Sequence, residues 1–341
     1  MKTKEPLVTV LLPAYNSEAF VRESLQSILD QTFTDFELIV IDDASTDGTV
    51  ALVKAFQDSR IRLVQKPHNT GYTDSLNNGI RLARGRYIAR MDADDISLPH
   101  RFQKQVQFLD AHPDVAVCGT WYKEIPGGQV AELPVEHEAI VLNLLSVNSL
   151  CHPSVMFRKD FFLSHGFRYN RDFESAEDYE LWTRVVAKGR LHNLPEVLLH
   201  YRIHPQQVTT QRNAFLLSRA ALCRKRMVAY LSGPLPKDDE DLLLRVLAGT
   251  RLRKGADLVR AIALFNRLQA QNASSGVYPQ DGFAALIETE KRLVVQNGYL
   301  LNTRFDRSLL RSFYQLKTER RYLTPTQRLR LVIKCLLLRK V

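Results

Sequence analysis

Residues 8–29 have the sequence VTVLLPAYNSEAFVRESLQSIL, and the order of apolar and polar residues in this segment indicates the fold class. Its apolar run from Val8 to Leu12 predicts a buried strand, and from about Glu18 to Leu29 the apolar residues recur at helical spacing. Asn16 or Ser17, which stand between the two, can cap the N-terminus of that helix. A strand, a polar loop and an amphipathic helix in this order predict the first unit of an α/β fold.

The same alternation of strand and helix continues through the next part of the chain. We predict further strands at Glu37 to Ile41, Ile61 to Val64 and Tyr87 to Met91, and helices at residues 50–56, 74–83 and 99–111. Strands joined by helices form right-handed βαβ units, so we expect an open, mostly parallel sheet flanked by helices. Ligands of such sheets bind beyond the carboxyl ends of the strands, where loops and helix N-termini meet.

Length and charge predict a second region after this α/β domain. The chain has 341 residues, of which 45% are hydrophobic and 25% charged, as in ordinary globular proteins. Residues 1–210 carry 22 Lys and Arg against 27 Asp and Glu, whereas residues 211–341 carry 25 against 10. We therefore predict an α/β domain over residues 1–210 and a basic, mainly helical region over residues 211–341. A basic surface favours nucleic acid, anionic lipid or an anionic polymer, and charge alone does not choose among them.

Two features of the sequence bear on its place in the cell. The start, MKTKEPLVTVLLPAYN, lacks the apolar region of a signal peptide, and no run of about 18 apolar residues occurs. The cysteines lie too far apart for a paired zinc motif and are too few for a disulfide scaffold; they are Cys118, Cys151, Cys223 and Cys335. We expect a protein of the reducing cytoplasm.

Three carboxylates stand directly after the strand predicted to end at Met91, namely Asp92, Asp94 and Asp95. Carboxylates this close repel one another unless they bind a cation or point into water. In an extended segment Asp92 and Asp94 project to the same side, so they can hold an oxygen-liganded metal ion and, through it, a phosphate. The alternative is a solvated acidic turn that caps the helix after Pro99, and the position at a strand end favours the metal site.

Side chains after the first two strands are candidates for nucleotide binding. Pro13 and Tyr15 follow the first strand, and the tyrosine ring could stack on a base, although packing is the commoner role of such a ring. Asp42 and Asp43 follow the second strand. A carboxylate there can accept a hydrogen bond from uracil or ribose, and the alternative is an Asx turn that caps the next helix. No glycine-rich phosphate loop follows any predicted strand, which favours a metal ion as the partner of the phosphates.

The sequence ESAEDYELW, residues 174–182, opens a predicted helix with several acidic residues. Acidic residues stabilise a helix N-terminus, which is the structural interpretation. The functional interpretation is that Asp178 removes the proton of an attacking hydroxyl, which needs hydrogen-bond reach and a modestly raised pKa. Further along, Arg202 could neutralise a pyrophosphate and His204 could complete the metal site, although a histidine in a loop is more often a surface residue.

Taken together, these segments resemble the family 2 glycosyltransferases, inverting enzymes with the nucleotide-sugar-binding GT-A fold. The matching sequences, which cover about residues 6–210, are VTVLLPAYNSEAFVRESLQSILDQTF, ELIVIDDASTDGT, NTGYTDSLNNGIRLARGRYIARMDADD, CHPSVMFRKDFF and ESAEDYELWTRV. The resemblance implies that a hydroxyl of a glycan or lipid-linked acceptor attacks the anomeric carbon, while Mn²⁺ or Mg²⁺ holds the departing diphosphate. It also implies a UDP-sugar donor, transfer of a hexose or N-acetylhexosamine, and a role in cell-surface polysaccharide synthesis.

The resemblance further assigns roles to the candidate residues. The nucleotide-sugar site that it implies consists of Pro13, Tyr15, Asp43 and Asp92. Asp94 is the main metal ligand that it implies, with Asp92 as the nucleotide-facing partner. Asp178 is the implied base, and Glu177 orients the acceptor or supports Asp178.

The last segment, Arg328 to Val341, lies outside the resemblance. It has five basic residues and no acid, and leucine, isoleucine and valine are interleaved with them. A helix of this kind can lie on an anionic membrane near a lipid-linked acceptor, and the alternatives are docking on the α/β domain or a dimer interface. The hypothesis that follows is a cytoplasmic protein in peripheral contact with the inner membrane face.

Two other classes of function compete with the glycosyltransferase. A metal-dependent nucleotidyltransferase also uses paired carboxylates on an α/β sheet, but its basic, glycine-rich triphosphate loop would stand after the first strand, where PAYNSEAF is found. A non-catalytic nucleotide-sugar or nucleic-acid binder is the third class. The sequence disfavours nucleic acid because it has no aromatic stacking run or recognised reading module.

Overall fold

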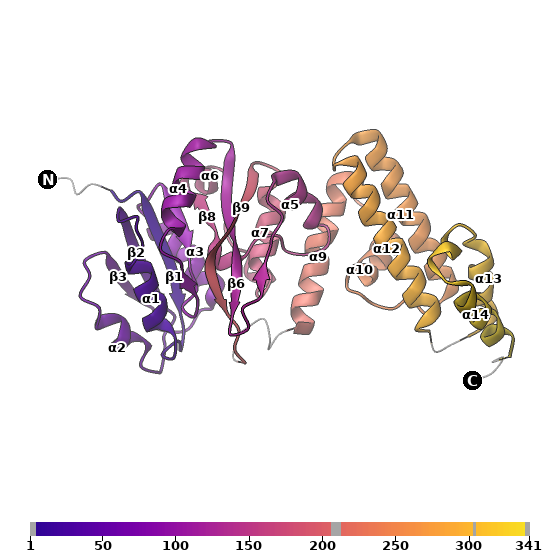
Figure 1. Cartoon of the computed structure of the whole chain (residues 1–341), viewed down its shortest axis with the longest axis horizontal. Helices are drawn as coiled ribbons and strands as arrows, with labels where there is room; N and C mark the ends of the chain where they lie inside the picture. Colours follow the sequence, from indigo (N-terminus) through magenta and orange to yellow (C-terminus); the bar gives the residue numbers. More distant parts are fainter. Residues whose placement is uncertain (1–4, 206–212, 303–304, 338–341) are drawn as a thin grey trace. The chain divides into compact units, whose positions relative to one another are not determined.

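The computed structural model describes residues 5–205, 213–302 and 305–337 (Figure 1). The chain divides into two compact units, of which the first comprises Met1–Leu144 with Asn148–Arg219 and the second Leu145–Val147 with Ala220–Val341. Of the predicted final segment, Leu338, Arg339, Lys340 and Val341 lie outside the described residues. All strands that the structure describes belong to the first unit.

The first unit begins with the predicted alternation of strands and helices. Apolar runs form the buried strands, and each helix turns an apolar stripe toward the sheet. The elements in chain order are β1 (Val8–Ala14), α1 (Val21–Leu29), β2 (Phe36–Asp42), α2 (Thr49–Lys54), β3 (Ile61–Gln65), α3 (Tyr72–Leu82) and β4 (Tyr87–Arg90). Every element predicted over this stretch is present, with small shifts at its ends.

The sheet has the strand order β3-β2-β1-β4-β8-β6-β9-β5, with β7 paired to β6. Its first four strands are parallel, because β1 pairs in parallel with both β2 and β4, and β2 pairs in the same way with β3. The register aligns Ala14 with Asp42, so the loops after β1 and β2 leave the sheet at one edge. The Met91 amide donates to the Leu11 carbonyl at 3.0 Å, which brings the end of β4 to the same edge.

The second half of the sheet mixes parallel and antiparallel pairs. Its strands are β5 (Ile96–Ser97), β6 (Val115–Ile125), β7 (Val130–Ala131), β8 (Met156–Arg158) and β9 (Arg190–Arg202). β8 is antiparallel to both β4 and β6, β5 is antiparallel to β9, and β6 and β9 are parallel with irregular register. The predicted α/β fold class is confirmed, but short strands such as β8 carry too few residues for a periodic signal.

One of the remaining helices of the first unit anchors the last residue of β4. These helices are α4 (Arg101–Ala111), α5 (His137–Asn143), α6 (Lys159–Ser164) and α7 (Glu177–Val185), with 3₁₀ turns η1 (His152–Ser154) and η2 (Arg171–Phe173). Arg101 of α4 is fully buried, and its guanidinium donates to the Arg90 carbonyl at 2.7 Å and to Gln105 Oε1 at 3.1 Å. Burial lowers the pKa of Arg101 to about 9. This buried side chain anchors the last residue of β4, from which the acidic run leaves the sheet.

Helix α1 starts without the predicted side-chain cap. Its N-cap residue is Phe20, and no side chain accepts a hydrogen bond there. Asn16 instead adopts a positive φ of 48°, and its Oδ1 accepts from the Thr46 amide at 2.8 Å. The Ser17 carbonyl accepts from the Val21 amide at 2.9 Å. The capping prediction was therefore wrong, because Asn16 ties the loop after β1 to the loop after β2.

The second unit is mainly helical in its described part, as predicted. Its elements, counting from the helix that leads into it, are α9 (Asn213–Ser232), α10 (Lys237–Leu247), α11 (Gly255–Ser275), α12 (Gln280–Leu300), α13 (Arg307–Gln315), η3 (Glu319–Tyr322) and α14 (Pro325–Leu337). Gly276, in the left-handed conformation at φ 64°, ends α11. The Asp306 side chain caps α13 by accepting from the Leu309 amide at 2.8 Å. Among the described residues, every helix is too short or too polar to span a bilayer.

Candidate active site

The acidic run after β4 forms the centre of the site. Ligand atoms of Asp92, Asp94 and Asp95 all lie within 4.8 Å of one another. Asp95 is fully buried, and its Oδ1 accepts from the Arg202 amide at 2.8 Å. Its Oδ2 has no hydrogen-bond partner among the described residues. A buried carboxylate oxygen without a partner is costly, and a bound cation would satisfy it.

Burial and mutual repulsion raise the pKa values in this cluster. Burial raises the pKa of Asp92 to about 6, with the charge of Arg90 opposing the rise and that of Asp94 adding to it. Burial, together with the charges of Asp92 and Asp94, raises the pKa of Asp95 well above its usual value. The protein thus leaves part of the negative charge unbalanced, which is the electrostatic condition for binding a cation.

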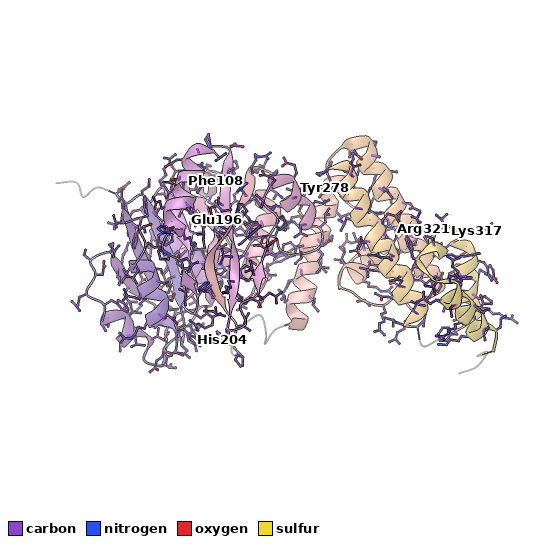
Figure 2. All side chains as sticks on the ribbon, in the orientation of Figure 1. Phe108, Glu196, His204, Tyr278, Lys317 and Arg321 are labelled. Carbon is purple, nitrogen blue, oxygen red and sulfur yellow. The ribbon has the colours of Figure 1, made fainter. Side chains whose placement is uncertain are left out.

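Arg202 and His204, at the carboxyl end of β9, contact the same acidic run. His204 Nε2 lies 2.9 Å from Asp94 Oδ2, and Figure 2 labels this histidine just beyond the strand. Arg202 Nε donates to the Asp94 carbonyl at 2.7 Å, and its Nη2 donates to Glu23 at 2.6 Å. The structure therefore brings both of these predicted residues to the acidic cluster, with the guanidinium of Arg202 also held by Glu23.

Arg90 is a site residue that the sequence reasoning missed. It is the last residue of β4, its side chain is buried, and its Nη2 forms an ion pair with Asp92 Oδ1. The guanidinium carbon lies 5.4 Å from the ring centroid of Tyr72, whose hydroxyl donates to the same Asp92 oxygen at 3.3 Å. Nε and Nη1 of Arg90 have no hydrogen-bond partner within the described part of the chain. The overlooked signal was a lone cation inside an apolar strand, directly before a carboxylate cluster.

A second carboxylate group lies at the N-terminus of α7. Asp178 Oδ2 accepts from Asn148 Nδ2 at 2.7 Å, and its Oδ1 accepts from the Tyr179 amide at 2.6 Å. Burial raises the pKa of Asp178 against these hydrogen bonds, which lower it. Burial and the charge of Asp178 raise the pKa of Glu177 to about 8. A fixed carboxylate with a raised pKa has the properties of a general base.

The two carboxylate groups share one electrostatic environment. The charge of Asp178 raises the pKa of Asp92, and the charge of Arg90 lowers the pKa values of Asp92, Glu177 and Asp178. Arg90 is therefore a buried cation whose charge acts on both groups. The fold brings the predicted metal ligands and the predicted base into one site, although about 80 residues separate them along the chain.

The loop after β1 presents an exposed aromatic ring at the same edge of the sheet. Pro13 lies within β1, and Tyr15 directly follows it, with 49% of its surface exposed. The Tyr15 carbonyl accepts from Ser17 Oγ at 3.2 Å. A tyrosine used for packing would be covered, whereas this ring is open to a planar ligand.

Asp43, by contrast, is buried and already hydrogen-bonded within the protein. Its carboxylate accepts from Lys66 Nζ at 2.6 Å and from the amides of Thr70 and Gly71 at 3.0 and 2.9 Å. These donors belong to the loop between β3 and α3. Asp43 therefore fixes that loop beside the end of β2, a structural role that the sequence reasoning did not include.

The groups gathered after β4 and β9 suit a divalent cation of the Mn²⁺ or Mg²⁺ kind. Such ions prefer carboxylate oxygens, which Asp92, Asp94 and Asp95 supply, and His204 adds one imidazole nitrogen. The four cysteines are free and buried. Most of the candidate ligands are therefore hard carboxylate oxygens, and the Asp95 oxygen without a hydrogen-bond partner among the described residues fits the presence of an ion.

The fold is that of the GT-A glycosyltransferases. The family model described as glycosyl transferase family 2 matches residues 9–171. The chain is also 32% identical over 239 residues to an uncharacterised glycosyltransferase of Haemophilus influenzae, a match that covers 66% of this chain and 74% of that protein. The protein belongs to glycosyltransferase family 2, which confirms the resemblance noted in the sequence.

Further relatives share the same region or the same fold. The O-antigen biosynthesis glycosyltransferase WbnJ of Escherichia coli is 34% identical over 217 residues, which are 61% of this chain and 83% of WbnJ. Residues 1–349 of S. aureus TarS, solved with UDP, superpose with a TM-score of 0.56 at 20% identity, covering 85% of this chain and 90% of that one. The mannosyltransferase PcManGT of Pyrobaculum calidifontis, solved with GDP-Man and Mn²⁺, superposes with a TM-score of 0.51 at 21% identity, covering 98% of this chain and 88% of that one. These two structures share the fold.

Proposed function

We propose that the protein is an inverting glycosyltransferase that moves a sugar from a nucleotide-diphosphate donor to a hydroxyl of a glycan or lipid-linked acceptor. One observation carries the proposal: a carboxylate cluster fit for a cation, one member of which pairs with the buried Arg90, shares the charge of that arginine with a separate carboxylate fit for a base. The transferred group is a hexose or N-acetylhexosamine. The relation to WbnJ, whose name refers to O-antigen biosynthesis, supports a role in cell-surface polysaccharide synthesis.

The acidic cluster is the proposed site of the leaving diphosphate. Asp94 and Asp92, with His204 beside them, would hold a Mn²⁺ or Mg²⁺ ion. When bound, that ion supplies positive charge that offsets the charge developing on the diphosphate. Arg202, which donates to the backbone of the same run, adds a second positive charge next to the phosphates.

Asp178 is the proposed base of the transfer. The acceptor oxygen attacks the anomeric carbon from the face opposite the diphosphate, Asp178 takes the hydroxyl proton, and the carbon–oxygen bond to the diphosphate breaks. Asn148 and the Tyr179 amide hold the carboxylate so that its orientation is fixed before the acceptor arrives. Glu177, with a pKa of about 8, is protonated at neutral pH and can donate a hydrogen bond that orients the acceptor or supports Asp178.

The nucleotide is proposed to bind at the ends of β1 and β2. The exposed Tyr15 ring stacks on the base, and Pro13 borders it. The Asp43 carboxylate already accepts three hydrogen bonds, and its remaining lone pair can accept from the N3 hydrogen of uracil. A UDP-sugar is the proposed donor, in keeping with the UDP bound to TarS.

The proposal assigns catalysis to the first of the two predicted regions. Residues 1–210 form the catalytic domain, and residues 211–341 form a basic helical region. The enzyme works in the cytoplasm, and a lipid-linked acceptor would bring it into peripheral contact with the inner membrane face.

A thermal-shift screen of UDP-, GDP- and dTDP-sugars, each with and without Mn²⁺, tests the donor assignment. A ligand stabilises only the state that it binds, and at one hundred times its Kd it adds about 2.7 kcal/mol to the free energy of unfolding. We expect a UDP-sugar to raise the Tm in the presence of Mn²⁺ and to have little effect without it. A larger rise with a GDP- or dTDP-sugar would contradict UDP, and the absence of any rise would contradict the function.

A further inference from the structure

Helix α14 has one apolar side buried against the second unit and another open to solvent. Leu331 and Cys335 are buried. Leu329, Ile333 and Leu336 are 62%, 42% and 57% exposed. Their spacing of four and three residues places the three exposed side chains on one face of the helix, away from the buried pair. We call Leu329, Ile333 and Leu336 the α14 stripe.

The α14 stripe differs from other exposed apolar residues of this unit. Leu293 on α12 and Val277 in the turn after α11 are 44% and 43% exposed, but neither belongs to a row of exposed apolar residues at helical spacing. Single exposed apolar residues are common on soluble proteins, whereas an ordered row marks a surface that contacts something.

Basic side chains flank the α14 stripe. Arg330 and Lys334, one residue after Leu329 and Ile333, are exposed on its edge, and neither forms an ion pair within the described part of the chain. Lys334 Nζ lies 4.9 Å from the ring centroid of Phe305. The sequence from residue 324 to the end contains no Asp or Glu. This face therefore combines apolar side chains with unneutralised positive charge.

The neighbouring helix α13 and the turn after it carry further exposed aromatic and basic side chains. Helix α13 packs against α14 and carries Tyr314, which is 52% exposed, and the exposed Lys317 follows it (Figure 2). Arg321, labelled nearby in the same view, is paired with Glu288 at 2.7 Å and contributes less free charge. Residues 305–337 contain eight Lys and Arg against two Asp and Glu. The segment that contains the α14 stripe is therefore strongly positive.

We propose that the α14 stripe inserts into the headgroup region of an anionic lipid bilayer, with α14 parallel to the membrane plane. Apolar side chains between cations match the layered chemistry of such a surface, where acyl chains lie beneath negative headgroups. A soluble polyanion would use the cations and leave the stripe in water. A second copy of this chain would bring the same positive charge to the interface, which opposes pairing. Membrane binding does not depend on the transfer reaction.

Flotation of the full-length protein with phosphatidylcholine vesicles, with and without phosphatidylglycerol, tests the proposal. We expect binding only to the anionic vesicles and release at high salt, because headgroup attraction is screened. Arg330→Gln with Lys334→Gln should weaken binding by about 25-fold, at roughly fivefold for each cation. Serine at Leu329, Ile333 and Leu336 should weaken it by at least roughly tenfold, because the apolar side chains no longer enter the bilayer.

Two control variants keep the outcome specific. Leu293→Ser removes an exposed leucine from α12, and Arg292→Gln removes an exposed cation from the same helix. Both should float like the unchanged protein. Equal flotation of the triple serine variant and the unchanged protein would overturn the proposal. The proposal would also be overturned if the unchanged protein never floats and instead forms a dimer, detected by light scattering, that the serine substitutions convert to a monomer. Thermal shift with the donor, measured in parallel, reports the transferase site separately.

Discussion

Replacement of Arg90 by Met probes the link between the protein's own charge and the proposed metal. Arg90 is buried, pairs with Asp92 and lies over the Tyr72 ring. Methionine fills the apolar part of the space and removes the charge. Because two of the guanidinium nitrogens have no hydrogen-bond partner in the described structure, the substitution chiefly removes the ion pair with Asp92.

The expected decrease in stability depends on pH. Removing one partner of a buried ion pair costs about 3–5 kcal/mol when the other partner stays charged. Protonation of Asp92 reduces this cost, because burial already raises the pKa of Asp92 to about 6 and removal of Arg90 raises it further. The pKa of Asp92 in the folded protein lies above its value in the unfolded chain, so the free energy of unfolding falls as pH rises. We expect a small decrease at pH 5.5 and about 3 kcal/mol at pH 7.5, which lowers the Tm by roughly 6–12 °C.

Added Mn²⁺ should reduce the difference in the free energy of unfolding between Arg90→Met and the unchanged protein at pH 7.5. In the variant the ion replaces the charge that Arg90 supplied to Asp92, so its binding adds more to the free energy of unfolding. Urea denaturation with and without MnCl₂ measures this difference, and Arg90→Lys, which keeps a cation, should respond almost like the unchanged protein. If Mn²⁺ stabilises Arg90→Met and the unchanged protein equally, Asp92 does not serve both the arginine and a metal ion.

Two further predictions concern the carboxylates of α7. Asp178→Asn should lower kcat by roughly 10²- to 10⁴-fold and change UDP affinity by no more than about twofold, whereas Asp172→Asn at an exposed site should leave both unchanged. Unaltered turnover in Asp178→Asn would rule out its role as the base. Glu177→Gln should flatten the pH dependence of stability. Because the pKa of Glu177 in the folded protein is about 8, the free energy of unfolding of the unchanged protein falls by up to about 1.4 kcal/mol per pH unit between the unfolded pKa of this residue and pH 8. A urea-denaturation series that shows the same slope in Glu177→Gln would contradict this.

The parts of the fold with strong local signals were predictable from the sequence. β1 to β4 are apolar runs bounded by helices, and their parallel pairing follows from the connections between them. β8 was not predictable, because three residues give no period and its place between β4 and β6 depends on tertiary pairing. The cap of α1 failed for a related reason, since Asn16 hydrogen-bonds to the distant Thr46.

Some parts of the candidate site could likewise be predicted from local sequence, and others could not. Asp92 and Asp94 stood out because three carboxylates follow a buried strand, and Asp178 because it opens an acidic helix. The contacts that tune them come from residues distant in sequence. Asn148 reaches Asp178 across 30 positions, and Tyr72 reaches Asp92 across 20. Local patterns identify the reacting groups, and the fold supplies the partners that set their charge and orientation.

Metal-dependent nucleotide binding at Asp94 is the most direct measurement of the proposed site. Isothermal titration of UDP into the unchanged protein should give a much higher affinity with Mn²⁺ than without it. Asp94→Asn should lose that increase, because it removes the carboxylate that lies beside His204 and within the acidic cluster. Glu132→Gln, an exposed control, should keep it. Full Mn²⁺ dependence of UDP binding in Asp94→Asn would contradict the assignment of the acidic run as the metal–diphosphate site.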